Sequence, residues 1–184
     1  MRKQILFVAL LLIGFAGDHC FGQTGATLRV ILVRHGEKPK NGSNLTCEGL
    51  NRSLQLPEVL NKKFGKPDYL YIPSLSLGDS TKHARMFETA IPLAVRYQLE
   101  ITSRFEEKDF SAIAANVKEK KGTVLMVWEH KAIKDIAAAL GVTDPPKWAD
   151  DDYDSIWIIT FSNNKSPVLT FDKENIKPSD KCPL

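Results

Sequence analysis

The stretch ILVRHGEKP, residues 31–39, places an arginine and a histidine directly after a run of apolar residues. The run from Leu28 to Val33 is apolar except for Arg29, which is the pattern of a short strand covered on both faces. Gly36 and Pro39 alone would be enough to turn the chain after such a strand. An arginine next to an imidazole therefore indicates a site that holds an anion and carries out chemistry on it.

A second histidine follows a second apolar run, TVLMVWEH at residues 123–130. Ligands of an open parallel sheet bind outside the carboxyl ends of its strands, so two parallel strands would bring His35 and His130 to one rim. A single histidine at a strand tip is more often structural. The pair, with Arg34 beside one member, favours a catalytic site. His83, at the start of a helix, is expected to be a solvated surface residue.

Apolar runs alternate with helical patterns along the rest of the chain. Further strands are predicted over 69–72, 123–128, 155–161 and 168–171, the last two as a hairpin. Helices are predicted from Thr46 with a new turn at Pro57, over 84–97 with a kink at Pro92, and over 133–140 with Gly141 as its end. This order predicts an α/β fold, a three-layer sandwich with a mainly parallel central sheet and helices on both faces.

Residues 1–22 have the order of a secretory signal peptide. Basic Arg2 and Lys3 precede the apolar run 5–16, and small residues follow. The run is shorter than the roughly 20 apolar residues that a transmembrane helix needs. We expect cleavage after Gly22, export to the periplasm or out of the cell, and a single domain over residues 23–184 that is not attached to a membrane.

Charge and cysteine content limit the partners. The whole chain has a net charge of +3, and loss of the signal peptide hardly changes this near balance. Nucleic acid is therefore not expected as a partner. Cys47 and Cys182 could pair in an oxidising compartment or could be two unrelated thiols. The sequence specifies no oligomeric state.

A third motif, STKHARMFETA at residues 80–90, is predicted to begin a helix. Arg85 and Thr89 are four residues apart and share a helix face. A helix that starts near Ser80 presents free amides and a positive dipole end, which favour a phosphate group. By itself, this motif is better interpreted as an amphipathic surface helix with an Arg85–Glu88 pair.

Together, these motifs resemble the histidine phosphatase superfamily, the phosphoglycerate mutase-like proteins. The resemblance spans nearly the whole mature chain in the family's order, and it rests on Arg34-His35-Gly36-Glu37, Leu45-Thr46 with Gly49 and Arg52, Arg85 with Glu88-Thr89-Ala90, and His130.

The resemblance implies a covalent phosphohistidine mechanism that needs no metal or other cofactor and acts on a small phosphorylated substrate. By this resemblance His35 is the nucleophile, and Arg34 and Arg85 bind the phosphate oxygens, to which the planar guanidinium is suited. His130 completes the pocket. Thr81 has the spacing of a serine that family members often carry, and Ser80 lies one residue further back.

The sequence departs from the family pattern at two points. Glu129 stands where a small residue is usual before the second histidine, and we expect it to face away from the pocket because neighbours alternate in an extended chain. The proton donor is implied at Glu107, in RFEEKDF at residues 104–110. Asp109 is the alternative, and a third possibility is that no dedicated acid exists.

The length of the chain bears on the reaction. The segment between His35 and His83 already contains a helix and a strand, which leaves little room for a domain that caps the site. This compactness favours hydrolysis of phosphomonoesters or phosphohistidine over mutase chemistry. The alternative is a phosphate-ligand binding protein on the same fold that has lost turnover. Trp148 and the acidic run 150–152 are interpreted as a polar loop anchored by one buried indole.

Overall fold

The computed structural model describes residues 27–76, 78–163 and 165–183, and the predicted signal peptide lies outside them. Within these residues six strands form one sheet in the order β3-β2-β4-β1-β5-β6. The strands are β1 (Arg29–Arg34), β2 (Tyr69–Tyr71), β3 (Ile101–Thr102), β4 (Thr123–Trp128), β5 (Ser155–Thr160) and β6 (Val168–Lys173), and the helices are α1 (Cys47–Phe64), α2 (Ala84–Tyr97), α3 (Phe110–Lys118) and α4 (His130–Leu140).

The sheet is mainly parallel, as the sequence predicts. Strand β4 pairs in parallel with β1 and β2, and β2 pairs in parallel with β3. Strand β5 is antiparallel to β1 and to β6, which confirms the predicted hairpin. Arg34 is in register with Trp128, so β1 and β4 end side by side. Residues that follow these two strands are therefore delivered to the same edge of the sheet.

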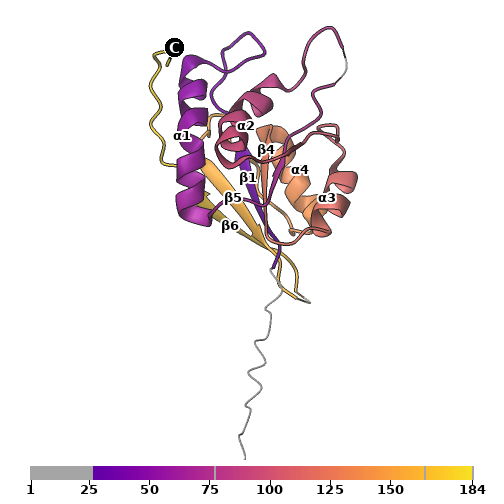
Figure 1. Cartoon of the computed structure of the whole chain (residues 1–184). Helices are drawn as coiled ribbons and strands as arrows, with labels where there is room; N and C mark the ends of the chain where they lie inside the picture. Colours follow the sequence, from indigo (N-terminus) through magenta and orange to yellow (C-terminus); the bar gives the residue numbers. More distant parts are fainter. Residues whose placement is uncertain (1–26, 77, 164, 184) are drawn as a thin grey trace, which may run out of the picture.

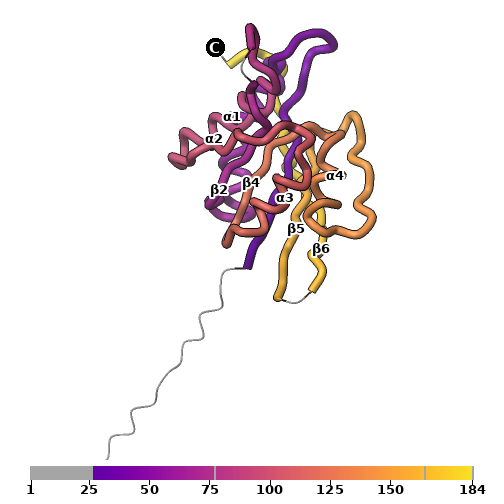
Figure 2. Tube along the Cα trace, turned by 90° about the vertical axis from the view of Figure 1, so that its right-hand side faces the viewer, coloured from indigo at the N-terminus to yellow at the C-terminus, as the bar shows by residue number. Residues whose placement is uncertain are grey.

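Helices cover both faces of the sheet, because alternate residues of each central strand are apolar on opposite sides. Val30 and Leu32 pack with α3 and α4, whereas Ile31 and Val33 pack with α1 and α2. Figures 1 and 2 show this three-layer arrangement, with α1 and α2 on one side and α3 and α4 on the other. None of the helices in the described ranges combines the length and the apolar character that crossing a membrane requires.

Helix α2 has the bounds predicted from the sequence and contains Pro92. Helix α1 differs from the expectation, because it runs through Pro57 as one helix where a new turn was predicted. A proline inside a helix costs about 3 kcal/mol. Each helix buries apolar residues on both sides of its proline, such as Leu56 and Leu60 in α1, and this packing outweighs the local cost. Strand β3 and helix α3 were not predicted, since a two-residue strand and a nine-residue helix carry little periodicity.

A disulfide bond joins Cys47, the first residue of α1, to Cys182 near the end of the chain. The side-chain amide of Asn51 donates to the carbonyl oxygens of Ser179 (2.8 Å) and Lys181 (2.7 Å). The C-terminal segment therefore runs alongside α1, as Figure 1 shows. Of the two readings of the cysteines that the sequence left open, the structure has the paired one.

The disulfide should contribute measurably to stability, because it closes a loop between residues 135 apart in sequence. We expect dithiothreitol to lower the free energy of unfolding by roughly 2–4 kcal/mol. Denaturant titrations with and without the reductant measure the difference. The double variant Cys47→Ser/Cys182→Ser should match the reduced protein and be insensitive to dithiothreitol. Equal stability of the oxidised and reduced proteins would contradict this expectation.

Candidate active site

The two motif histidines lie at the edge where β1 and β4 end. The backbone N–H of His35 donates to the carbonyl oxygen of Trp128, the last residue of β4, at 3.2 Å. His35 directly follows β1, and His130 is the first residue of α4, two residues beyond β4. The structure thus brings both imidazoles to one rim of the sheet, as parallel strands require.

The imidazole of His35 is held in one tautomer. Its Nδ1 lies 2.7 Å from the carbonyl oxygen of Gly36, and because a carbonyl only accepts, Nδ1 carries the proton. The side chain is 1 % exposed, and its buried Nε2 has no hydrogen-bond partner in the described part of the chain. Nε2 therefore presents a lone pair.

Burial and charge keep this imidazole neutral. Desolvation, together with the nearby Arg34, Arg85 and His130, lowers the pKa of His35 to about 3 against the opposing hydrogen bond to Gly36. These three groups are therefore close enough to His35 to influence its protonation. An unprotonated imidazole next to arginines can act as a nucleophile towards an anion.

The loop that carries His35 is fixed by contacts with α1 and α2. The N–H of Gly36 donates to Oγ1 of Thr89 at 3.0 Å, and this hydroxyl donates to the carbonyl oxygen of Arg85 at 2.7 Å. Gly36 also packs against the backbone of Gly49, where a Cβ atom would lie 2.7 Å from the Gly49 oxygen. Two glycines are required because no side chain fits between these backbones. Thr89 is thus a positioning residue for the histidine loop.

A buried network of charged side chains holds Glu37, the residue that follows Gly36. Arg52 donates through Nε and Nη2 to the carboxylate of Glu37 (2.9 and 2.6 Å) and through Nη1 to Glu174 (2.7 Å). Burial raises the pKa of Glu174 to about 7 although Arg52 opposes this. The network connects the histidine loop to the C-terminal segment. Sequence reasoning found Glu37 and Arg52 as motif positions but missed Glu174, whose position in the sequence carries no signal of this contact.

Arg34 is oriented by the loop that precedes β5. Its Nη1 donates to the carbonyl oxygens of Asp150 (2.8 Å) and Asp152 (3.1 Å), and its guanidinium carbon lies 3.8 Å from the ring centre of Tyr153. Burial lowers the pKa of Arg34, and the neighbouring Tyr153 and carboxylates oppose this. The indole of Trp148 is buried and donates to the same Asp152 oxygen at 2.8 Å. The loop is anchored by one indole, as predicted, but it also forms a wall of the site.

The environment of His130 corrects one expectation. Glu129 does not face away, because its carboxylate lies 3.6 Å from Nδ1 of His130. The alternation of an extended chain stops here, since His130 begins α4 and Glu129 is its N-cap residue. On the other side, Nε2 of His130 lies 3.2 Å from the exposed carboxylate of Asp150. Burial and then Arg34 lower the pKa of His130, and the two carboxylates partly restore it.

The remaining sequence-predicted residues lie around this centre. Arg85 is the second residue of α2 and is partly exposed. Thr81 is exposed in the segment that precedes α2. The structure therefore gathers Arg34, His35, Arg85 and His130, and it leaves Thr81 at the solvent edge.

Glu107 lines a cavity on the side of His130. The cavity has a volume of about 410 Å³ and is also lined by Glu129, which ties it to His130. The carboxylate of Asp109, the alternative acid, instead accepts from the backbone N–H of Glu106 at 3.2 Å within its own turn.

His83 is not the solvated residue we expected, because its side chain is 18 % exposed and lies 3.4 Å from Glu107.

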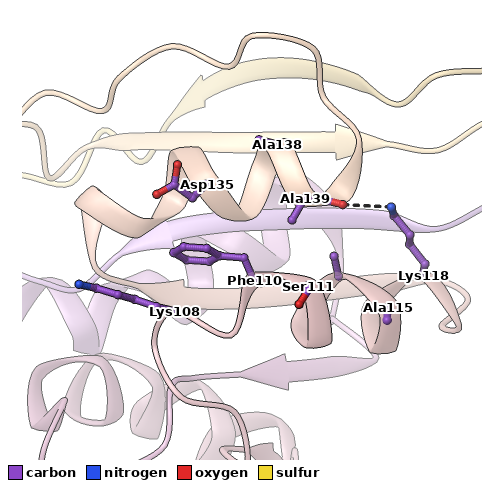
Figure 3. A pocket seen from close by; sticks show the side chains of 9 residues that line it. Lys108, Phe110, Ser111, Ala115, Lys118, Asp135, Ala138 and Ala139 are labelled. Carbon is purple, nitrogen blue, oxygen red and sulfur yellow. Dashed lines mark hydrogen bonds between the residues drawn. The ribbon is translucent and has the colours of Figure 1, made fainter.

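A second hollow, of about 800 Å³, lies between α3 and α4. Figure 3 shows Lys118 at one end of it, where the ammonium group donates to the Ala139 oxygen at 3.0 Å. Alanines form much of its lining, and Lys108, Phe110 and Asp135 are common to both hollows. It offers a surface next to the site but no group comparable to His35.

Positive charge at the site comes from side chains. No group of three or more His, Cys, Asp or Glu residues within the described ranges could hold a metal ion. Arg34 and Arg85 are the groups suited to phosphate oxygens here.

Comparisons with known proteins support the fold. No family profile and no curated protein sequence matches this chain. Among solved structures, a mutant phosphoserine phosphatase from Entamoeba histolytica with bound phosphoserine is similar, with a TM-score of 0.55 and 15 % identity over 80 % of this chain and 97 % of that one. The protein histidine phosphatase SixA with tungstate gives 0.53, with 16 % identity over 79 % and 97 %. A phosphoglycerate mutase from Bacillus anthracis gives 0.51, with 14 % identity over 81 % and 93 %. The chain has the phosphoglycerate mutase-like α/β fold.

The low pKa of His35 predicts a pH dependence of stability. Between about pH 6.5 and 3 the unfolded chain binds a proton at this residue and the folded chain does not, so folding loses stability as the pH falls. In His35→Asn this slope should be smaller by about 1.4 kcal/mol per pH unit. Urea titrations of both proteins from pH 7 to pH 4 measure it. Parallel curves for the two proteins would show that His35 is not kept neutral by the fold.

Proposed function

We propose that this protein is a metal-independent phosphatase of the histidine phosphatase superfamily, which hydrolyses phosphomonoesters or phosphohistidine through a covalent phosphohistidine at His35. The observation that carries the proposal is the buried, unprotonated Nε2 of His35 close to Arg34, Arg85 and His130. The fold shared with two phosphatases and a phosphoglycerate mutase supports it.

In the first step, Nε2 of His35 attacks phosphorus in line with the leaving oxygen. The P–N bond forms, the P–O bond breaks, and the leaving oxygen takes a proton from Glu107. Arg34 and Arg85 neutralise the non-bridging oxygens, which is the main requirement of phosphoryl transfer. Because Nδ1 already donates to Gly36, the imidazole needs no change of tautomer before it attacks.

In the second step, water attacks the phosphohistidine. The P–N bond breaks, its electron pair returns to Nε2, and the carboxylate of Glu107 takes the proton that water releases. Inorganic phosphate then leaves the site, and the acid is restored for the next turnover.

His130 is proposed to donate to a phosphate oxygen. Its Nε2 lies 3.2 Å from the carboxylate of Asp150, so a phosphate oxygen competes with this carboxylate for the imidazole. The Asp150 side chain is 68 % exposed and can turn into solvent when phosphate binds. Phosphate binding thereby exchanges one anionic partner of His130 for another.

The organisation of the chain favours hydrolysis over mutase chemistry. The segment between His35 and His83 contains α1 and β2, which belong to the sandwich itself. A mutase must keep its phosphorylated intermediate away from water. A compact chain of this organisation instead favours transfer of the phosphoryl group to water.

We also propose that the mature protein is exported to the periplasm or secreted. The disulfide between Cys47 and Cys182 supports this location, because disulfide bonds persist in oxidising compartments. The apolar segment that precedes residue 23 supports it independently.

We expect the mature protein to hydrolyse p-nitrophenyl phosphate, and to do so undiminished in EDTA because two arginines supply the charge that a metal would. His35→Ala should lose turnover, since no neighbouring group can replace an in-line imidazole. Absorbance at 405 nm follows the reaction, and thermal melts show that the variant is folded. Tight phosphate binding without any turnover of the wild type would favour the binding-protein alternative, and loss of activity in EDTA with recovery in zinc or magnesium would indicate another class of phosphatase.

A further inference from the structure

His83 is held in an orientation that the rest of its helix does not explain. It is the N-cap residue of α2, with a left-handed backbone (φ 54°) that is uncommon for residues other than glycine. Its Nδ1 lies 2.7 Å from the carbonyl oxygen of Ser74, at the end of the loop that follows β2. Its Nε2 lies 3.4 Å from Oε2 of Glu107, on the loop that follows β3. The imidazole therefore bridges two loops at the same edge of the sheet as His35.

These two contacts constrain which atoms of His83 and Glu107 can carry a proton. The Ser74 carbonyl only accepts, so Nδ1 of His83 carries a hydrogen. A neutral imidazole then directs the lone pair of Nε2 at a carboxyl oxygen. Two lone pairs repel each other, so this 3.4 Å contact becomes attractive when His83 and Glu107 share one proton. This proton is either on the imidazole, which makes an ion pair, or on the carboxyl, which makes a neutral hydrogen bond.

The pair borders a cavity whose wall continues to the neighbour of His130. Glu107 shares its cavity with Glu129, and Glu129 lies 3.6 Å from His130. The backbone carbonyl of Glu107 accepts from Nε1 of Trp128 at 3.0 Å, which ties the loop to the end of β4. The side chain of Glu107 is 21 % exposed and can reach both the cavity and solvent.

We propose that His83 is a positioning residue that shares a proton with Glu107, so that the two side chains act together as the proton donor. The inference rests on the proposed function and deepens it. When the P–O bond breaks, the one shared proton passes to the leaving oxygen through Glu107, which leaves a carboxylate beside a neutral His83. When water attacks the phosphohistidine, the released proton returns to the pair, so that each turnover leaves the proton count unchanged.

Other charged groups face the pair and bear on its titration. From the loop and α4, the cavity of Glu107 also carries Lys108, Glu129, Lys131 and Asp135. Two are cationic and two anionic, so their effects on the shared proton largely oppose each other. Arg85 follows His83 by two residues on α2 and adds one positive charge. The direct partner of His83 remains the carboxylate of Glu107.

The test compares two leaving groups across pH. Glycerol phosphate has a poor leaving group that needs a proton, whereas p-nitrophenolate hardly needs one. In His83→Asn the alkaline limb of kcat/KM for glycerol phosphate should move to lower pH by roughly two units, the interval between ordinary imidazole and carboxyl titrations. The profile for p-nitrophenyl phosphate should not move. Asparagine suits the replacement because it tolerates the left-handed backbone and its amide can donate to Ser74.

Two further variants complete the design. Glu107→Gln should slow hydrolysis of glycerol phosphate far more than that of p-nitrophenyl phosphate, and Asp109→Asn, on the same turn, should match the wild type. An unmoved alkaline limb in His83→Asn, or equal slowing of both substrates in either His83→Asn or Glu107→Gln, would overturn the inference while leaving His35 as the nucleophile. Absence of turnover in the wild type would instead contradict the proposed function.

A measurement without substrate covers a His83→Asn variant that fails to fold. The Hε1 resonance of His83 can be followed by NMR against pH in the wild type and in Glu107→Gln. Loss of the carboxylate should move the titration of His83 to lower pH, because the imidazolium loses its anionic partner. Identical titration curves in both proteins would overturn the inference on their own.

Discussion

One hydrogen bond determines the chemistry of this molecule, that from Nδ1 of His35 to the carbonyl oxygen of Gly36. It commits the ring proton to the backbone and leaves Nε2 as the reactive atom. The bond lasts only if the loop is rigid, and the close packing of Gly36 on Gly49, with the Thr89 hydroxyl on the Gly36 amide, makes it so. The interlocked sheet and helices thus orient a single nitrogen.

The surroundings of that nitrogen are a balance of buried charge. Arg34 is buried, yet its Nη1 is satisfied by two carbonyl oxygens, so the residue stays in place without an anion. Arg52 is likewise buried and satisfied by its partners, because it donates to both Glu37 and Glu174. Removing one member of such a network leaves an unpaired buried charge, which costs several kcal/mol. The site is therefore preorganised before a ligand arrives.

The central strands and the meeting of His35 with His130 could be predicted because apolar runs and strand-end positions are local signals. The continuity of α1 through Pro57 could not, since it depends on packing against the sheet. Glu129 was placed wrongly because alternation was extended one residue past the end of β4. His83 was misread because its two partners, Ser74 and Glu107, come from loops whose proximity only the folded sheet creates. The contacts of Arg34 with backbone carbonyls could not be predicted either, because every residue has a carbonyl and the side-chain pattern carries no signal of them.

The most direct test of this account is the identity of the atom that carries the phosphoryl group. Rapid mixing with a reactive phosphomonoester, an alkaline quench and peptide mapping should place phosphate on His35, and ³¹P NMR of the denatured phosphoprotein should assign it to Nε2. The adduct should survive base and decay in acid. Phosphate on Nδ1 of His35 or on another residue would contradict the account. Turnover by a variant that lacks the His35 imidazole would contradict it as well.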